Sequence, residues 1–288
     1  MPPAVLCFGE LLWDLLSSGA FPGGAPFNVA YHLHRLGVPA LPVSAIGRDD
    51  LGSQLLQRLD AWGISTAAIG RHPTAPTGRV TATLSPTGDA HYAIATGVAW
   101  DFIPASDAAL AAAARAPAIV FGSLALRSVE NRQTLARLVA ALPAPAWRVF
   151  DVNLRAPHDD LALVRHHARL ANVLKLNADE AARLAEGTTE TPGREEDHAR
   201  ALAEQLHVPF VCITAGARGA GLLRDHRWTW MPAQPVVVVD TIGAGDAFLA
   251  AFLAGLLRGG QSDAGLLAAA CRRGEWVAAR PGATPPAE

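Results

Sequence analysis

The sequence predicts an α/β fold with a mostly parallel central sheet, helices on both faces and a small β lid. Short runs rich in β-branched and aromatic residues alternate with longer runs rich in alanine and leucine, which is typical of βαβ units. These short runs are apolar throughout, as expected for parallel strands that are buried on both faces. One segment with alternating polar and apolar residues interrupts this order and predicts the lid.

The strands and helices are expected in the following order. Residues 4–16, "AVLCFGELLWDLL", predict a strand, and residues 27–37, "FNVAYHLHRLG", predict a helix that ends at Gly37. The next strand is expected over 40–47 and the next helix over 50–63. Further apolar runs predict the other strands of the sheet: 118–126, 147–154, 173–177, 210–216 and 235–241.

Residues 77–97, "TGRVTATLSPTGDAHYAIATG", predict a hairpin of two alternating strands around a Ser-Pro-Thr-Gly-Asp turn. The hairpin is too small to be a domain, so we expect it to form a lid across the carboxyl edge of the main sheet. Residues 1–288 are then expected to form a single domain, with a lid made mainly of 77–97.

Composition excludes several classes of protein. Half of the residues are apolar and 17% are charged, which suits a well-packed globular enzyme. The net charge of −2 favours neither a nucleic-acid nor a membrane-surface partner. The three cysteines form no metal or disulfide pattern and indicate a reducing cytoplasm, in agreement with the lack of a recognisable signal peptide. No apolar run is long enough to cross a bilayer. The histidines show no metal-ligand spacing and are expected on the surface.

The stretch "VVVVDTIGAGDAFLAAFLAGLLRG", residues 236–259, carries the clearest sign of chemistry. Ligands of parallel sheets bind beyond the carboxyl ends of the strands, where Asp240 and Thr241 are expected. The N–H groups of the Gly-Ala-Gly turn and the positive end of the following helix favour an anion, most naturally a phosphate. Asp246 is either an ordinary N-cap or a base that accepts a proton from a nucleophilic hydroxyl. The pattern leaves both roles open.

The sequence lacks the usual nucleotide-binding loops. The P-loop requires a lysine after its glycines, and the only lysine, Lys175, lies in "VLKLN" outside any such loop. Protein-kinase signatures are missing. "GAGDAF" lacks the third glycine of the dinucleotide fingerprint, so a Rossmann oxidoreductase is disfavoured.

Two segments resemble the signatures of the ribokinase-like carbohydrate kinases, also called the PfkB family. "DTIGAGDAF" (240–248) resembles the C-terminal signature and "GGAPFNVAYHLHRLG" (23–37) the N-terminal one. Further motifs follow in family order: "IGRDDLG" (46–52), "DVNLR" (151–155), "NADE" (177–180), "TAGARG" (214–219) and "RPGATP" (280–285). The details "GELLWD", "FGSLAL" and "DVNLR" resemble the fructokinase branch most.

The resemblance implies a ribokinase-like three-layer fold and ATP-dependent transfer of the γ-phosphoryl group to a sugar hydroxyl. ATP, Mg²⁺ and, in some members, K⁺ are the implied cofactors. The residues that match the catalytic base and the anion hole are Asp246 and, for the hole, Gly243, Ala244 and Gly245. The residues that match the sites for Mg²⁺ and nucleotide are Asn177 and Glu180 for the ion and the phosphates, and Thr214, Gly216, Gly219 and Cys271 for the nucleotide. A helix-start carboxylate stays open for Glu180, and a buried core thiol for Cys271.

At the sugar end, the residues that match hydroxyl-binding positions of the family are Asp14, Gly23, Gly24 and Asn28. A carboxylate beside glycines suits sugar binding, because it accepts hydrogen bonds from a diol while the ring approaches closely. Asn28 is alternatively a helix cap, and Arg155 either reaches phosphate or sugar or pairs with a nearby acid. The residues that match the monovalent-cation site of the family are Asp240, by its side chain, and Ile242, Val277, Arg280 and Gly282, by their carbonyls.

Two features depart from the family pattern. Only nine positions separate Asp14 from Gly23, where many relatives have lid strands, so a small lid is expected. Phe27 is bulky where relatives often have a small residue. A homodimer stays open, because the short segment weakens any inference about lid-mediated dimers.

Three readings of the function follow, each with small molecules as partners. A sugar kinase that uses fructose is the first. A kinase for ribose, 2-keto-3-deoxygluconate or a nucleoside is the second. A catalytically silent protein that binds sugar or nucleotide is the third, and the intact Asp246 with its glycine turn argues against it.

Overall fold

The computed structural model describes residues 3–16, 19–84 and 90–286 of the chain. Its centre is a nine-stranded sheet with the order β13-β12-β11-β10-β9-β8-β1-β4-β5. Neighbouring strands pair in parallel from β5 to β11, and β12 and β13 add an antiparallel edge. The strands are β1 (Val5–Phe8), β4 (Ala40–Gly47), β5 (Ile69–His72), β8 (Ala118–Gly122), β9 (Trp147–Asp151), β10 (Val173–Asn177), β11 (Phe210–Thr214), β12 (Ala220–Arg224) and β13 (Arg227–Met231).

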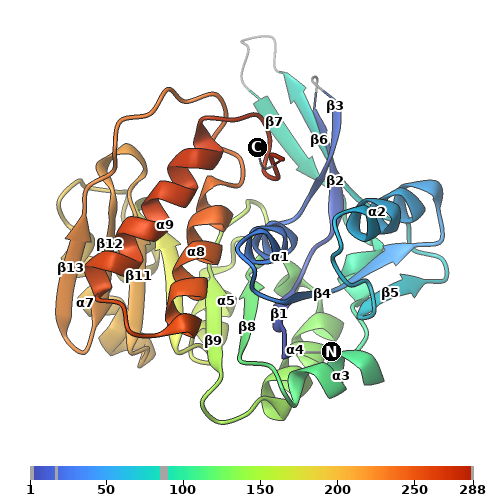
Figure 1. The fold of residues 1–288 in the computed structure, drawn as a ribbon, viewed down its shortest axis with the longest axis horizontal. Helices are drawn as coiled ribbons and strands as arrows, with labels where there is room; N and C mark the ends of the chain where they lie inside the picture. The colour runs from blue at the N-terminus through green and yellow to red at the C-terminus, as the bar shows by residue number, and fades with distance from the viewer. Residues whose placement is uncertain (1–2, 17–18, 85–89, 287–288) are drawn as a thin grey trace.

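Helices cover both faces of this sheet (Figure 1), which confirms the predicted three-layer α/β fold. One face carries α1 (Ala25–Arg35), α8 (Ala244–Arg258) and α9 (Asp263–Ala278). The other face carries α3 (Asp107–Ala113), α4 (Val129–Ala141), α5 (Leu161–Ala168), α6 (Ala178–Glu186) and α7 (Glu195–Leu206). Helix α2 (Asp50–Ala61) packs beside α1 through a smaller apolar cluster. Within the described residues, no helix is long and apolar enough to cross a membrane.

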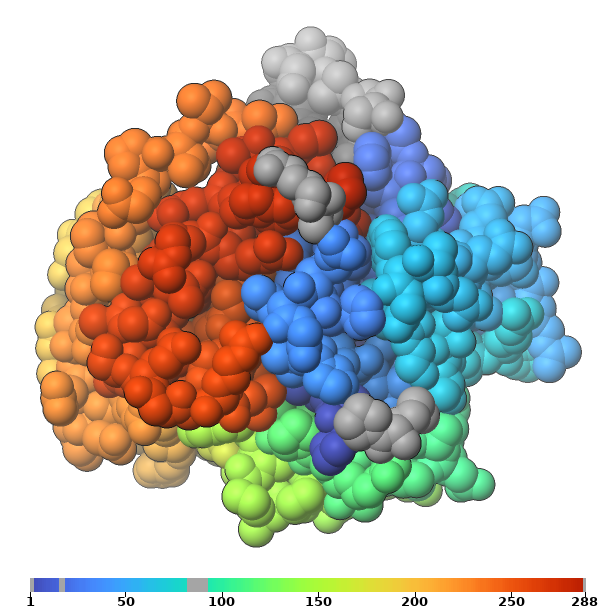
Figure 2. Space-filling model, in the orientation of Figure 1, coloured from blue at the N-terminus to red at the C-terminus, as the bar shows by residue number. Residues whose placement is uncertain are grey.

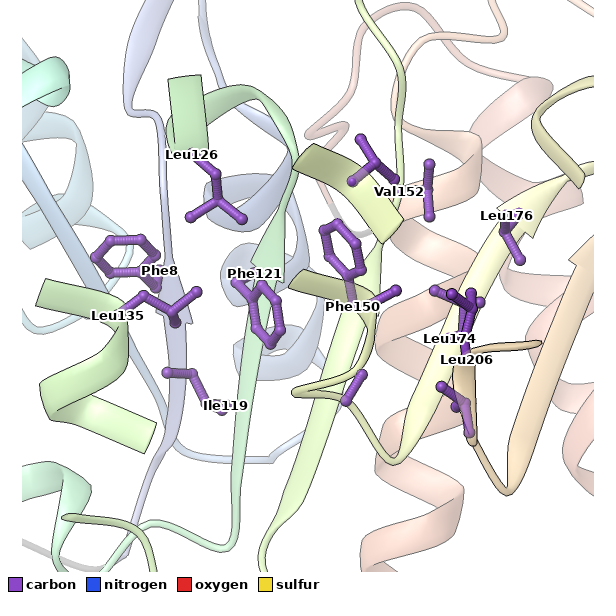
Figure 3. Packing of buried hydrophobic residues seen from close by; sticks show 14 of the residues in the cluster. Phe8, Ile119, Phe121, Leu126, Leu135, Phe150, Val152, Leu174, Leu176 and Leu206 are labelled. Atoms are coloured by element: carbon purple, nitrogen blue, oxygen red, sulfur yellow. The ribbon is translucent and has the colours of Figure 1, made fainter. Parts of the chain in front are cut away.

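The apolar runs of the central strands are explained by burial on both sides. In β1, Leu6 and Phe8 belong to the cluster beneath α3 to α7, and Val5 and Cys7 belong to the cluster beneath α1, α8 and α9. In the first cluster, Phe121 of β8 stacks on Phe150 of the neighbouring β9, with ring centroids 5.0 Å apart (Figure 3). Strands of this kind need apolar residues at every position rather than at every second one.

A second, four-stranded sheet with the order β3-β2-β6-β7 lies at the edge of the fold from which the carboxyl ends of the central strands emerge (Figure 1). Its strands are β2 (Leu12–Leu16), β3 (Gly19–Gly23), β6 (Gly78–Leu84) and β7 (Ala90–Ile94). The predicted hairpin therefore exists, and its expected turn, residues 85–89, lies outside the described residues. We call this four-stranded sheet the lid sheet. Two of its strands, β2 and β3, come from residues 12–23, and the other two, β6 and β7, form the hairpin.

The expectation of one strand over residues 4–16 was wrong. β1 ends at Phe8 and β2 starts at Leu12, and the two strands belong to different sheets. Glu10 lies between them, buried, with Oε1 accepting a hydrogen bond from the N–H of Ala25 at 3.1 Å. The chain leaves the core sheet at this residue because the carboxylate binds the start of α1 instead of continuing an apolar strand.

The expectation of a strand over residues 235–241 was also wrong. Val236 to Val239 form no strand and are exposed, Val237 by 85%. The N–H groups of Val239 and Asp240 donate to the carbonyl of Ala278, at the end of α9, at 2.8 and 3.2 Å. A run of valines favours a strand only where a pleated neighbour is available, and here the backbone pairs with a helix end. This segment (orange in Figure 1) leads from β13 to the start of α8.

Candidate active site

The ends of three parallel strands and the start of α8 meet at one place. β9 ends at Asp151, β10 at Asn177 and β11 at Thr214, and α8 starts at Ala244. Because parallel strands all end at the same edge of the sheet, this edge is where a ligand is expected.

The turn before α8 presents backbone N–H groups without protein acceptors. Gly243 is the N-cap residue, with φ 77°, and a Cβ on it would lie 2.5 Å from the Cβ of Ala283, so only glycine fits. In the described part of the chain, the N–H groups of Gly243 and Gly245 bind no protein acceptor. The N–H of Ala244 donates to the Thr241 carbonyl at 3.2 Å, so it closes the turn and does not face a ligand as expected. Two of the three expected donors are therefore free, at the positive end of a helix.

Asp246 is not an N-cap. It is the third residue of α8, and its Oδ2 accepts a hydrogen bond from Asn28 Nδ2 at 2.8 Å, across to α1. Only 9% of the residue is exposed. Burial and the charge of Asp151 raise the pKa of Asp246 to about 7, against the opposing effects of the Asn28 hydrogen bond, Lys175 and Arg155. A carboxylate with this pKa is suited to proton transfer near neutral pH.

Lys175 and Asp151 form a buried ion pair that the sequence analysis missed. Lys175 Nζ lies 3.0 and 3.3 Å from the two carboxylate oxygens of Asp151. A Cβ placed on Gly245 would lie 3.1 Å from this Nζ, so the ammonium group lies directly against the turn before α8. Burial alone would lower the pKa of Lys175, but the carboxylates around it, Asp151 first, raise it. The available signal was a single lysine in an apolar strand of a chain whose other basic side chains are arginines and histidines.

Asn177 and Glu180 form a capping box at the start of α6. Asn177 Oδ1 accepts from the Glu180 N–H at 2.8 Å, and Glu180 Oε2 accepts from the Asn177 N–H at 2.9 Å. Glu180 Oε1 also accepts from the Leu154 N–H at 2.7 Å. Burial raises the pKa of Glu180, and Lys175 opposes this. The helix-start carboxylate is therefore the observed geometry, and the free lone pairs of these oxygens can bind an ion through water.

A cavity of about 530 Å³ opens between the end of β11 and the start of α8. The expected nucleotide residues Thr214, Gly216, Gly219 and Cys271 all line it, with Val236 and Val238 of the misassigned segment. Burial raises the pKa of Cys271 to about 11, so its thiol stays protonated and inert. Cys271 is therefore a buried core thiol that also lines the cavity, and its contact with a nucleotide stays a prediction.

The expected sugar residues lie on the other side of Asp246. Asp14 is in β2, and a Cβ on Gly23 would lie 2.0 Å from its Oδ2, so a side chain at Gly23 would displace the carboxylate. Gly24 is the N-cap of α1, so the alternative of Asn28 as a cap is wrong. Asn28 Oδ1 is buried without a partner in the described part of the chain, which leaves an acceptor for a ligand hydroxyl. Burial and the charge of Glu10 raise the pKa of Asp14 to about 6.

Glu10 and Arg155 complete this side of the site. Glu10 was missed, although the quoted "GELLWD" contains it; its Oε2 is buried without a partner among the described residues. Arg155 is exposed, and its Nη1 donates to the Leu154 carbonyl at 3.0 Å. No ion pair of Arg155 occurs within residues 3–16, 19–84 and 90–286, but its charge lowers the pKa of Glu10, Asp14 and Asp246. Its field therefore acts on all three of these acids.

The residues expected to bind a monovalent cation come together, but internal hydrogen bonds already use several of them. Asp240 Oδ1 accepts from the Ile242 N–H at 2.9 Å, and Oδ2 accepts from the Gly282 N–H at 3.0 Å. The Val277 carbonyl accepts from the Arg280 N–H at 2.8 Å. The bond from Gly282 to Asp240 ties the C-terminal loop, Arg280–Pro285, to the turn before α8.

The expectation that the histidines lie on the surface was wrong for three of them. His32, His167 and His198 are buried. His32 Nε2 lies 2.9 Å from the Ala283 carbonyl, in the C-terminal loop. Metal-ligand spacing in a sequence cannot reveal a histidine that binds a backbone carbonyl. Within the described residues, no group of three His, Cys, Asp or Glu side chains is placed to hold a metal ion.

Comparison with known proteins identifies the class of enzyme. The model of the "pfkB family carbohydrate kinase" matches residues 10–288, and the chain belongs to this family. A fructokinase from Klebsiella pneumoniae is 29% identical over 267 residues, which cover 88% of this chain and 85% of that one.

Solved structures agree. A sugar kinase from Pyrococcus horikoshii, PH1459, in complex with ATP has a TM-score of 0.81 at 27% identity, covering 97% of this chain and 94% of that one. Aminoimidazole riboside kinase from Salmonella enterica, complexed with aminoimidazole riboside and an ATP analogue, has a TM-score of 0.81 at 26% identity, covering 98% and 95%. The protein is therefore an ATP-dependent sugar kinase with a ribokinase-like fold.

Proposed function

We propose that this kinase is a fructokinase, which transfers the γ-phosphoryl group of ATP to a primary hydroxyl of fructose. The observation that carries the proposal is the hydrogen bond between Asn28 and Asp246, which joins an expected sugar residue to the candidate base, beside the cavity that Ala244 and Gly245 line. Fructokinases among the relatives, including those from Klebsiella, Rhizobium and Salmonella, support fructose as the sugar.

In the proposed reaction, a sugar hydroxyl lies beside Asp246. Asp14 and the unpartnered Oδ1 of Asn28 accept hydrogen bonds from other hydroxyls, while Asn28 Nδ2 holds the Asp246 carboxylate. The attacking hydroxyl passes its proton to Asp246 as its oxygen bonds to the γ-phosphorus and the bond to the ADP oxygen breaks. With a pKa of about 7, Asp246 is ionised and able to accept this proton at and above neutral pH.

The turn before α8 would stabilise the charge on the moving phosphoryl group. The free N–H groups of Gly243 and Gly245 are fixed in place, so they donate without reorganisation. Lys175 lies against the same turn and adds a buried positive charge. Asp151 keeps Lys175 charged and oriented.

The residues present fit ATP and Mg²⁺. The cavity beside Thr214 has room for a nucleotide, and its inner end reaches Gly245 at the start of α8. When bound, Mg²⁺ would supply positive charge that neutralises the phosphates. Asn177 and Glu180 would hold the ion through water molecules, because the oxygens of Glu180 already accept hydrogen bonds from backbone N–H groups. Asp240 and the carbonyls of the C-terminal loop would hold K⁺ next to the turn.

A panel of acceptors tests the sugar. Fructose, ribose, 2-keto-3-deoxygluconate and adenosine are each mixed with enzyme, ATP and Mg²⁺, and ADP formation is followed. We expect the highest kcat/KM with fructose. A kcat/KM about tenfold higher with another acceptor, equal to about 1.4 kcal/mol of transition-state binding, would replace fructose by that acceptor.

A nucleoside is the second candidate substrate. Aminoimidazole riboside kinase shares this fold, and 26% of its aligned residues are identical to those of this chain. Adenosine and aminoimidazole riboside in the panel decide between the two. A silent binding protein would show no acceptor-dependent ADP formation with any member of the panel while still binding ATP.

A further inference from the structure

The C-terminal loop, Arg280–Pro285, is fastened to helix α1 by two side chains. His32 Nε2 lies 2.9 Å from the Ala283 carbonyl, and Tyr31 Oη donates to the Pro285 carbonyl at 2.8 Å. Both side chains are buried. Figure 2 shows the surface of the C-terminal helices (red) directly beside α1 (blue).

Ala283 lies against Gly243. A Cβ on Gly243 would lie 2.5 Å from the Cβ of Ala283, 2.6 Å from its Cα and 3.0 Å from its oxygen. The two residues are therefore in close backbone contact. Gly243 is the N-cap of α8 and carries one of the free N–H groups. Ala283 thus packs directly against the Cα of Gly243.

The hydrogen bonds of His32 have a defined direction. Arg273 Nη2 lies 3.0 Å from His32 Nδ1, and a guanidinium group can only donate, so Nδ1 is the acceptor. The proton therefore lies on Nε2 and is donated to the Ala283 carbonyl. Arg273 is itself held against the Trp276 ring, 4.3 Å from its centroid. Burial, with the charge of Arg273, lowers the pKa of His32 to about 4, so the ring stays neutral near pH 7.

The same helix also holds the candidate base. Asn28, one turn before Tyr31 and His32, lies on the same side of α1 and binds Asp246. One face of α1 therefore contacts both ends of the phosphoryl-transfer site, Asp246 through Asn28 and Gly243 through His32 and Ala283.

We propose that His32, with Tyr31, is a positioning residue for phosphoryl transfer. His32 touches neither nucleotide nor sugar positions; it sets the place of Ala283 and so the direction of the Gly243 N–H relative to Asp246. The inference rests on the proposed anion-hole role of Gly243. Small displacements of a catalytic donor reduce the rate of the chemical step more than they reduce substrate binding.

The test compares three variants. His32→Leu removes both hydrogen bonds, His32→Gln supplies an amide donor and acceptor in their place, and His167→Leu removes another buried histidine, bonded to Leu163 in its own helix on the opposite face. We expect His32→Leu to lower kcat by about tenfold or more, with KM for the best acceptor of the panel within about twofold. His32→Gln should recover most of kcat, and His167→Leu should keep kcat while losing thermal stability.

Hydrogen exchange provides a readout that needs no turnover. In His32→Leu without ligands, the amides of 240–246 and 280–285 should exchange faster than in the wild type, and in His167→Leu they should not. Tyr31→Phe, which loses only the bond to Pro285, should have a smaller effect of the same kind and serves if His32→Leu does not fold.

Three results would overturn the proposal. These are an unchanged kcat per folded molecule in His32→Leu or Tyr31→Phe, a loss of kcat without faster exchange in the two segments, and an equal loss in His167→Leu. If exchange rises while kcat stays constant and Asp246→Asn is inactive, the kinase mechanism stands and the positioning role is wrong.

Discussion

The start of α8 and the lid sheet are held in different ways. At the start of α8, buried charged and polar groups hold one another in place, since Lys175 binds Asp151 at 3.0 Å and Asn28 binds Asp246 at 2.8 Å. The lid sheet rests on the body at its base, where Trp100 packs against Gly78 and Arg127 donates to the Ala95 carbonyl at 2.7 Å. Its far end is exposed at Gly19 and Ala20.

This difference matches two tasks. Phosphoryl transfer needs donors and base in fixed places, which a dense set of buried polar contacts supplies. Admission of a sugar needs an element that moves, and elements with few buried contacts open at low cost. Changes at the start of α8 should therefore alter kcat, and changes at the lid should alter exchange and access.

The largest effect is expected for Asp246→Asn. The amide can still accept the hydrogen bond from Asn28, but it cannot take a proton, so kcat should fall by at least about 10². Nucleotide affinity should stay close to normal. Steady-state ADP formation with the best acceptor and a direct binding measurement with ADP check both.

The stability of Asp246→Asn separates the catalytic role from a structural one. The folded pKa of Asp246 is raised to about 7, so the stability that this group contributes is lost as pH rises through that value. Asparagine carries no such charge, so the variant should melt at or above the wild-type temperature at alkaline pH. A large drop in melting temperature, or a kcat close to wild type, would contradict the base assignment.

The next effect is expected for Lys175→Met, which removes the buried charge against Gly245. It also leaves Asp151 without its partner, and an unpaired buried carboxylate is costly. The double variant Lys175→Met/Asp151→Asn is therefore the better test, because it removes the charge of Lys175 without leaving an unpaired carboxylate. We expect its kcat to fall by about 10-fold to 10²-fold while it melts at a higher temperature than the single variant. A double variant with wild-type kcat would show that the pair is structural only.

The pH profile should report Asp246 directly. Below a pH of about 7, kcat should fall by about tenfold for each pH unit, because the base is protonated. Asp151 raises the pKa of Asp246 more than Lys175 lowers it, so in the double variant, which loses both charges, this decline should begin at lower pH. In Lys175→Met alone, which keeps Asp151, the decline should begin at higher pH. A profile flat through neutral pH would contradict the assignment.

The start of α8 was largely predictable because its geometry is local. A glycine turn, a helix start and an acid at the third position of the helix are adjacent in the chain, so Gly243, Gly245 and Asp246 follow from the motif. The central sheet followed from apolar runs that only burial on both faces explains. In both cases the pattern of residues within one short segment is enough to predict its structure.

The remainder depended on contacts between distant residues. Nothing local shows that Lys175 reaches Asp151, that Glu10 binds the start of α1, or that His32 reaches Ala283. Val236 to Val239 have strong β propensity but no strand to pair with, so propensity misled. Each error lies where tertiary packing overrides a local preference.

A smaller effect is expected from the cation. K⁺ bound by Asp240 and the loop carbonyls would order the turn before α8 and raise kcat a few-fold. The existing bonds of Asp240 to Ile242 and Gly282 hold this turn without an ion, which limits the gain. Rates are compared in potassium and in a large organic cation at matched ionic strength. Equal rates in the two salts would contradict the proposed K⁺ site.

The smallest change in rate, and the clearest change in motion, should come from the lid sheet. We propose that sugar with nucleotide closes it over the cleft and excludes water, which limits ATP hydrolysis. Hydrogen exchange in β6 and β7, followed over Gly78–Leu84 and Ala90–Ile94, should slow when both ligands are present and less with either alone. β8, buried in the central sheet, is the internal control, since its exchange should not change. Identical exchange in β6 and β7 with and without both ligands would mean that this sheet is a fixed wall. The prediction that the lid sheet moves while the start of α8 stays fixed would then be wrong. The roles assigned to the residues at the start of α8 would stand.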